Sequence, residues 1–240
     1  MVLFDIDGTL IRTHGAGVRA FEQTAAKHFG LVDGIRKLQF AGRTDSSLIR
    51  ELLTHHGVPV TPENAIRFHE YYLFLLDAYL EHSTGGPCPG VLKFLGDLQT
   101  LAHPPLIGLL TGNIRLGAEI KLRRFGLWGR FEMGAFGDDH EDRNELARIA
   151  LARGRARLGG TLTGEEVLVI GDTPHDIQCG RAIGARVLAV GTGGASLEQL
   201  QVHEPDWMVA DLEGFDVREL AGPLPPRPLN SQELRLAKQP

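Results

Sequence analysis

The chain has 240 residues and a formal net charge of -5, and 42% of its residues are hydrophobic and 23% charged. These values indicate a globular protein with enough residues for one large or two modest domains, and the acidic balance argues against a nucleic-acid-binding surface. No stretch approaches the roughly 20 apolar residues of a membrane span, and Asp5 and Asp7 interrupt the apolar run that a signal peptide would need. Because Cys88 and Cys179 show neither metal-ligand nor disulfide spacing, we expect a protein of the reducing cytoplasm.

Short apolar runs alternate with amphipathic stretches along most of the chain, which is typical of a parallel sheet covered by helices. The first expected strand covers residues 2–5, and only helical patterns follow until about residue 82. Apolar residues three and four apart predict helices in this block over residues 18–29, 46–56 and 63–80. The alternation then resumes, with strands expected at 106–110, 131–136, 167–170, 186–190 and 207–209, and helices at 91–101, 114–125, 144–152 and 177–183.

Two glycine-rich segments, residues 15–17 and 85–90, flank the all-helical block and have the composition of a matched pair of hinges. The fold class that we expect is therefore α/β, with a three-layer, Rossmann-like parallel sheet core interrupted after its first strand by a helical cap domain. We assign residues 1–15 and 86–240 to the core and residues 16–85 to the cap. From Gly222 onward the proline-rich sequence predicts an extended tail.

Two acids, Asp5 and Asp7, stand at the end of the first expected strand. Residues two apart in an extended segment point the same way, and a buried pair of carboxylates repels unless a cation or a proton lies between them. Gly8 and Thr9 then provide a residue free to take positive φ and a short hydroxyl, which suits a loop around an anion. This strand end therefore indicates a functional site.

The other strand ends carry complementary groups, and ligands of doubly wound sheets bind at the carboxyl ends of the strands. Thr111, Gly112 and Asn113 follow the strand at 106–110 and offer a hydroxyl, an amide and a helix N-terminus to an anion. The other two strand ends add a polar loop that leads to Arg143, and the acids Asp172 and Asp176. Several carboxylates with an anion site and an arginine indicate a magnesium ion that bridges the protein to a phosphoryl group.

The chain resembles the haloacid dehalogenase superfamily, in its phosphoglycolate phosphatase-like branch with a small helical cap of the C1 type. The resemblance rests on residues 5–10, 111–113 and 171–176, each at its strand end and in the family's order, and extends over roughly residues 1–215. It implies a Mg²⁺-dependent phosphatase for a small phosphate monoester, with a phosphoglycolate-like compound as one candidate substrate. It further implies that Asp5 is the nucleophile that forms an aspartyl-phosphate, and that Asp7 is the general acid and base.

The resemblance also implies the roles of the remaining groups. Thr111 and the Gly112 amide would bind the transferring oxygens, with Asn113 beside them. The metal ligands would be Asp5, the carbonyl of Asp7 and Asp172, with Asp176 acting through water or from outside the direct ligands. A different explanation of Asp176 is that it caps the helix expected at 177–183.

One position departs from the family pattern, since relatives usually carry a lysine near a proline where this chain has residues 139–143 with no lysine. Arg143 is permanently charged and could bridge Asp5 and the phosphate by two hydrogen bonds. The alternative is that Arg143 pairs with surrounding acids on the surface, and Arg148 is then the next candidate. In the cap, Arg43 could meet a substrate carboxylate or phosphate, while Thr44 or Asp45 caps the following helix.

Two alternative functions stay open at this point. A phosphoglucomutase-like enzyme keeps the same core residues, so the core motifs do not exclude phosphoryl transfer to a sugar phosphate. A non-catalytic binding protein of the same fold is expected to have lost Asp5, Asp7 or Asp172, and all three are present. We expect the partner to be a small phosphorylated metabolite rather than a nucleic acid or a membrane, and the protein to be a monomer or a homodimer.

Overall fold

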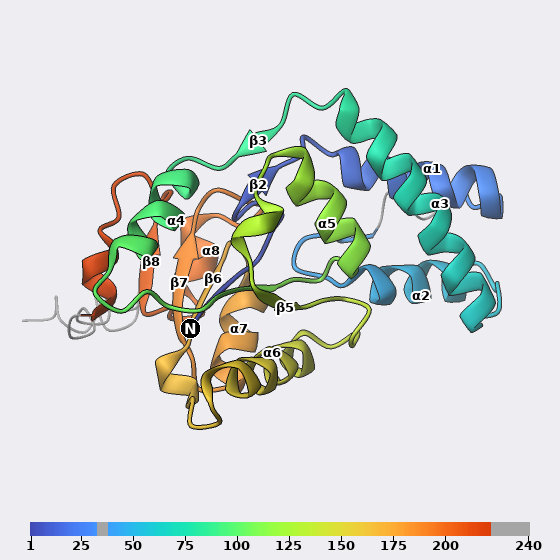
Figure 1. Ribbon diagram of the computed structural model, residues 1–240. Helices are drawn as coiled ribbons and strands as arrows, with labels where there is room; N and C mark the ends of the chain where they lie inside the picture. The colour runs from blue at the N-terminus through green and yellow to red at the C-terminus, as the bar shows by residue number, and fades with distance from the viewer. Residues whose placement is uncertain (33–37, 222–240) are drawn as a thin grey trace, which may run out of the picture.

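A computed structural model of the protein describes residues 1–32 and 38–221, so the tail predicted from Gly222 lies outside the described residues. Its centre is a six-stranded sheet of order β5-β4-β1-β6-β7-β8, and every pairing within it is parallel. The expected α/β fold with a parallel sheet is confirmed (Figure 1). The strands are β1 (Val2–Phe4), β4 (Ile107–Leu110), β5 (Met133–Ala135), β6 (Leu168–Gly171), β7 (Arg186–Val190) and β8 (Trp207–Val209).

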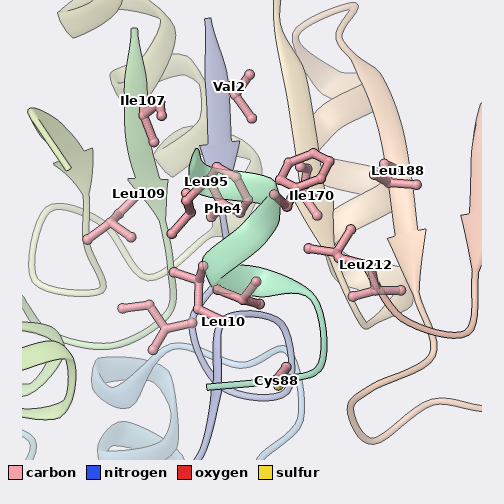
Figure 2. Packing of buried hydrophobic residues seen from close by; sticks show 14 of the residues in the cluster. Val2, Phe4, Leu10, Cys88, Leu95, Ile107, Leu109, Ile170, Leu188 and Leu212 are labelled. Carbon is pink, nitrogen blue, oxygen red and sulfur yellow. The ribbon is translucent and has the colours of Figure 1, made fainter. Parts of the chain in front are cut away.

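The sheet is buried on both faces, which explains why its strands are continuous apolar runs. Successive residues of β1 point to opposite sides, so Val2 and Phe4 join one hydrophobic cluster and Leu3 joins another. The first cluster includes side chains of α4 (Val91–Thr100) and α5 (Arg115–Arg124), and Figure 2 shows its packing around Phe4. The second includes side chains of α6 (Arg143–Leu158), α7 (Pro174–Ala182) and α8 (Leu197–Gln201). Two helical layers therefore enclose the sheet.

The three helices between β2 (Ile11–Arg12) and β3 (Gly86–Pro87) share a hydrophobic cluster of their own. They are α1 (Ala16–Phe29), α2 (Asp45–His55) and α3 (Pro62–Glu81), and Phe21 and Phe68 pack at its centre with ring centroids 4.7 Å apart. Thr61 caps α3 by accepting a hydrogen bond from the Asn64 amide at 3.3 Å, and Pro62 lies in the first turn, where its missing N–H costs nothing. No described helix is long and apolar enough to cross a membrane.

The two connections to this helical block pair with each other. β2 (Ile11–Arg12) and β3 (Gly86–Pro87) form a two-stranded antiparallel ribbon that sequence patterns did not predict, because two residues are too few to show an alternation. A Cβ on Gly85 would lie 2.0 Å from the Arg12 carbonyl oxygen, so the close approach of these two segments requires glycine at position 85. The hinge role of the two glycine-rich segments stays a prediction.

Hydrogen bonds of the turn at residues 44–46 attach the helical block to the carboxyl edge of the sheet. The Asp45 amide donates to the Gly112 carbonyl at 2.8 Å, and the Ile114 amide donates to the Asp45 carboxylate at 2.9 Å. The Thr44 and Ser46 hydroxyls donate to backbone carbonyls of the loop after β5, at 2.9 and 2.8 Å. Because the Thr44 hydroxyl also accepts from the Ser47 amide, Thr44 rather than Asp45 caps α2.

Replacing Phe94 by alanine should test the packing of α4 on the sheet. The Phe94 ring is buried and meets Phe4 edge to face, with centroids 6.1 Å apart. Phe94→Ala should lower the free energy of unfolding by about 3–5 kcal/mol, as measured by urea denaturation. Leu92→Ala, at a 60% exposed position of the same helix, should change it by less than about 0.5 kcal/mol. Equal losses in the two variants would contradict this packing.

Asp45 should make stability depend on pH. Its partial burial raises its pKa to about 6, against the lowering effects of Lys121 and of the Ile114 amide. Between about pH 4 and pH 6 the folded protein therefore holds a proton that the unfolded chain has released, and this carboxyl's contribution to stability falls as the pH rises. Asn at this position keeps an oxygen for the Ile114 amide but does not titrate.

As the pH rises from 4 to 6, we expect the free energy of unfolding of Asp45→Asn to increase by about 1–2 kcal/mol relative to that of the natural protein. Denaturant unfolding at a series of pH values measures this difference. If the free energy of unfolding changes with pH in the same way for both proteins, Asp45 is not the group that causes the pH dependence.

Candidate active site

A cavity of about 490 Å³ lies between the carboxyl edge of the sheet and the helical block. Its volume falls in the range of small-molecule sites, about 300–1,000 Å³. Every site residue predicted from the sequence lines the cavity except Asp176: Asp5, Asp7, Arg43, Thr111, Gly112, Asn113, Arg143 and Asp172. The opposite wall comes from the helical block and includes Val18, Phe21, Leu48 and Tyr72. The cavity is therefore polar on the sheet side and largely apolar on the other.

Asp5 is buried directly after β1, where its amide donates to the Ile170 carbonyl at 3.0 Å. The chain then turns sharply, and Gly8 has a φ of +86°. A Cβ on Gly8 would lie 2.6 Å from a carboxylate oxygen of Asp172, so this turn needs glycine for both its backbone and its space. The Gly8 turn thus packs directly against Asp172, the residue that follows β6.

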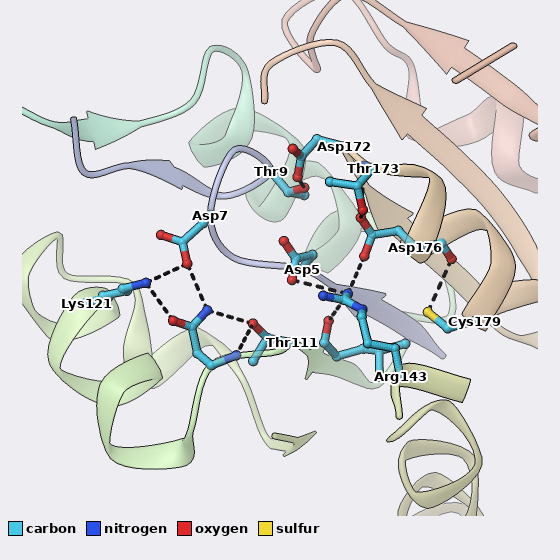
Figure 3. A network of polar contacts seen from close by, with 12 residues as sticks. Asp5, Asp7, Thr9, Thr111, Lys121, Arg143, Asp172, Thr173, Asp176 and Cys179 are labelled. Carbon is cyan, nitrogen blue, oxygen red and sulfur yellow. Dashed lines mark hydrogen bonds and ion pairs between the residues drawn. The ribbon is translucent and has the colours of Figure 1, made fainter. Parts of the chain in front are cut away.

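Three buried acids, Asp5, Asp172 and Asp176, have carboxylate oxygens within 4.8 Å of one another. Burial, followed by the charge of Asp176, raises the pKa of Asp5 well above its usual range and that of Asp172 to about 7. The Thr9 hydroxyl donates to Asp172 at 2.8 Å (Figure 3). The Gly194 amide donates to the other Asp172 oxygen at 3.1 Å, so both oxygens of this carboxylate are held in place. Such a group of hard oxygen donors fits Mg²⁺, whose charge would offset the repulsion.

Arg143 is the cation that the structure brings to these acids. It is the first residue of α6, is only 8% exposed, and donates through Nη2 to Asp5 at 3.4 Å and to Asp176. Burial alone would lower its pKa, but the carboxylates of Asp176 and Asp5 raise it, so the guanidinium stays charged. Arg148 lies outside the cavity lining and pairs with Glu145 on the surface of the same helix. The structure thus favours Arg143 over surface pairing.

Asp176 takes part in the start of α7, and its expected role beside a metal stays a prediction. One of its oxygens accepts from the Thr173 amide at 3.0 Å and from the Thr173 hydroxyl at 2.7 Å, which forms a capping box at the start of α7. Its other oxygen accepts from Arg143. Asp176 is fully buried beside the cavity rather than in its wall, so it lies behind the groups that a ligand would touch.

The loop after β4 forms the other side of the site. The Thr111 hydroxyl accepts from the Asn113 amide at 3.2 Å and from the Asn113 side chain at 2.9 Å. The Asn113 side chain also donates to Asp7 at 2.8 Å, so it is tied to the acids and to Thr111. A Cβ on Gly112 would lie 2.1 Å from the Arg43 carbonyl oxygen, so only glycine allows the turn at residues 41–46 to rest here.

Sequence reasoning missed Lys121, whose ammonium lies 2.6 Å from an Asp7 oxygen and 2.6 Å from the Asn113 side-chain oxygen. It comes from α5 and is 4% exposed. One sequence feature pointed to its burial: Lys121 lies on the face of α5 that also buries Ala118 and Leu122. Lys121 reaches the site from the second turn of α5 rather than from a loop that follows a strand, so the pattern of polar residues at strand ends gives no sign of it.

Arg43 differs from its expected arrangement. Its guanidinium pairs with Glu51 on α2 at 2.7 Å, although the residue lines the cavity. The structure thus shows Arg43 at the cavity wall but directed to a protein partner.

Comparison with known proteins agrees with this geometry. The profile of the Haloacid dehalogenase-like hydrolase family matches residues 2–190. A phosphoglycolate phosphatase of Chromobacterium violaceum is 28% identical over 205 residues, which cover 83% of this chain and 88% of that protein. Pyrophosphatase PpaX of Bacillus pumilus is also 28% identical, over 87% of this chain and 90% of its own length.

Among solved structures, CbbY from Rhodobacter sphaeroides in complex with phosphate superposes with a TM-score of 0.69 at 19% identity, over 89% of this chain and 94% of that one. At this identity the likeness shows the fold alone. The family profile covers most of the chain, and the two relatives, a phosphoglycolate phosphatase and a pyrophosphatase, align along nearly their whole length. The chain belongs to the haloacid dehalogenase-like hydrolase family, and it is an enzyme of the phosphoric monoester hydrolase type.

Proposed function

We propose that this protein is a Mg²⁺-dependent phosphatase that hydrolyses a small phosphate monoester through an aspartyl-phosphate on Asp5. One observation carries the proposal. The buried Asp5 carboxylate lies within 4.8 Å of two further acids and in contact with the Arg143 guanidinium, at the floor of a cavity of ligand size. A carboxylate between a cation and a metal-binding group of oxygens is placed to attack phosphorus.

In the first step an Asp5 oxygen forms a bond to phosphorus while the bond from phosphorus to the ester oxygen breaks. The Asp7 carboxyl donates its proton to that leaving oxygen. Arg143, the Thr111 hydroxyl and the Gly112 amide bind the oxygens of the transferring group. In the second step Asp7 takes a proton from water, the water oxygen attacks phosphorus, and Asp5 leaves as a carboxylate with release of inorganic phosphate.

The acidic side of the site provides the metal ligands of the proposal. Asp5, Asp172, the backbone carbonyl of Asp7 and, through water, Asp176 would hold Mg²⁺. When bound, the ion supplies charge neutralisation and orients the phosphoryl group against the nucleophile. The donor set supports this assignment because it consists of oxygen atoms only and carries more negative charge than Arg143 offsets.

We propose that residues 16–85 act as a cap over a core of residues 1–15 and 86–240. The separate hydrophobic cluster of α1, α2 and α3 and the ribbon of β2 and β3 support this division. A closed cap would exclude bulk water from the reactive aspartyl-phosphate. The substrate would be a small phosphorylated metabolite, for which the named phosphoglycolate phosphatase relative suggests a phosphoglycolate-like compound. We further expect a cytoplasmic monomer or homodimer.

Asp5→Asn should abolish turnover of p-nitrophenyl phosphate, by at least about 10³-fold in kcat, because the amide cannot serve as the nucleophile. Activity of the natural protein should require added Mg²⁺ and should disappear with a chelator. Asp97→Asn, at a partly exposed acid of α4 that pairs with Lys93, serves as the control and should keep full activity. Full activity of Asp5→Asn would refute the nucleophile assignment, and isomerisation of a sugar phosphate without net hydrolysis would favour the mutase alternative.

Arg43 should contribute to binding of a negatively charged leaving group once it exchanges Glu51 for substrate. Arg43→Gln should then raise KM for 2-phosphoglycolate about tenfold, or about 1.4 kcal/mol, with less effect on ethyl phosphate, which lacks the carboxylate. Arg67→Gln is a control within the cap, because Arg67 lies over the Phe29 ring and outside the cavity lining. An equal change in KM for both substrates would show that Arg43 does not recognise the carboxylate.

A further inference from the structure

Lys121 is a buried cation that the mechanism above does not use. Its ammonium contacts Asp7 and Asn113, each at 2.6 Å, and lies at the opposite side of the site from Arg143 (Figure 3). These two buried cations of the site have separate partners: Arg143 pairs with Asp5, the proposed nucleophile, and Lys121 pairs with Asp7, the proposed acid and base.

The contacts fix the orientation of the Asp7 carboxylate. Its Oδ2 accepts from both Lys121 at 2.6 Å and the Asn113 side chain at 2.8 Å. Its Oδ1 accepts no hydrogen bond from the residues that the structure describes, and the Asp7 side chain is 41% exposed in the cavity wall. Two donors on one oxygen stop the carboxylate from rotating, so the other oxygen is presented to the cavity.

The surroundings of Lys121 indicate that its charge is needed there. Burying an ammonium costs free energy unless it is paired, and an apolar side chain on this stripe of α5 would pack without that cost. The neighbouring helix α1 leaves room for it, since a Cβ on Gly17 would lie 3.4 Å from the Lys121 ammonium. Core and helical block thus enclose a charged group whose partners, within the described chain, are both residues of the site.

We infer that Lys121 is a positioning residue that holds Asp7 so that its Oδ1 faces the ester oxygen of the substrate. The inference rests on the proposed function, because it concerns the step in which Asp7 acts as an acid. In that step the proton on Oδ1 passes to the leaving oxygen as its bond to phosphorus breaks and the bond from Asp5 to phosphorus forms. Without Lys121 the carboxylate rotates, and the proton is less often in line with the leaving oxygen.

This role makes a specific prediction about leaving groups. Phenolate is a basic leaving group and needs the proton from Asp7, whereas p-nitrophenolate departs readily without it. The two phenyl phosphates have nearly the same shape, so binding differences are small. The parameter kcat/KM reports formation of the aspartyl-phosphate and excludes the later step in which Asp7 acts as a base.

Lys121→Met keeps the length of the side chain and removes the charge. We expect kcat/KM for phenyl phosphate to fall about 100-fold, and that for p-nitrophenyl phosphate to fall less than about threefold. Lys93→Met, which removes an exposed lysine of α4, should leave both values unchanged. Circular dichroism and thermal unfolding report whether Lys121→Met is folded, and Lys121→Gln provides a second, more polar variant for the same assay.

The double variant with Asp7→Asn separates positioning from direct contact with substrate. If Lys121 acts through Asp7, Lys121→Met has no further effect on phenyl phosphate in the Asp7→Asn background, which supports the inference. An undiminished effect in that background, or an equal loss for both leaving groups in a folded single variant, would overturn it. Absence of turnover by the natural protein with either substrate would instead reject the proposed function itself, and the role of Lys121 with it.

Discussion

The crowding of negative charge at the carboxyl edge of the sheet is the constraint on which the rest of this structure depends. Asp5, Asp172 and Asp176 are buried with their oxygens within 4.8 Å of one another, and burial with mutual repulsion raises the pKa values of Asp5 and Asp172. Arg143 offsets part of this charge, and the three carboxylates together could hold a divalent cation. Glycine at position 8 follows from the same crowding, since a Cβ there would collide with Asp172.

The cavity is formed jointly by the sheet edge and the helical block, and the two contribute different kinds of side chain to it. The sheet edge presents acids and donors at fixed positions, because parallel strands end together and Asp5, Thr111 and Asp172 each follow one. The helical block adds an apolar wall and rests on the core through the turn at residues 44–46. In the proposed function, substrate choice would therefore depend on side chains of the block, and the reaction on side chains of the core.

The sequence predicted the core better than the details of the site. Buried parallel strands are continuous apolar runs, so all six were expected within two residues of their observed ends, whereas the two-residue strands β2 and β3 carry no pattern. Helix α6 ends at Leu158, beyond the end that the sequence pattern predicted. The pattern missed these last turns because they are rich in arginine rather than in apolar residues. The acids and Arg143 could be predicted because each follows a strand. Lys121 could not, because it reaches the site from within a helix. No local sequence pattern shows that the Arg43 guanidinium pairs with Glu51.

The central claim is that phosphoryl transfer proceeds through a covalent bond to Asp5. The most direct measurement is rapid acid quenching of the protein during turnover with Mg²⁺, followed by proteolysis and mass spectrometry of the N-terminal peptide. The account predicts a phosphoryl group on Asp5 that hydroxylamine removes and that the Asp5→Asn variant never acquires. Steady turnover with no phosphorylated peptide at any quench time, or a phosphoryl group on another residue, would contradict it.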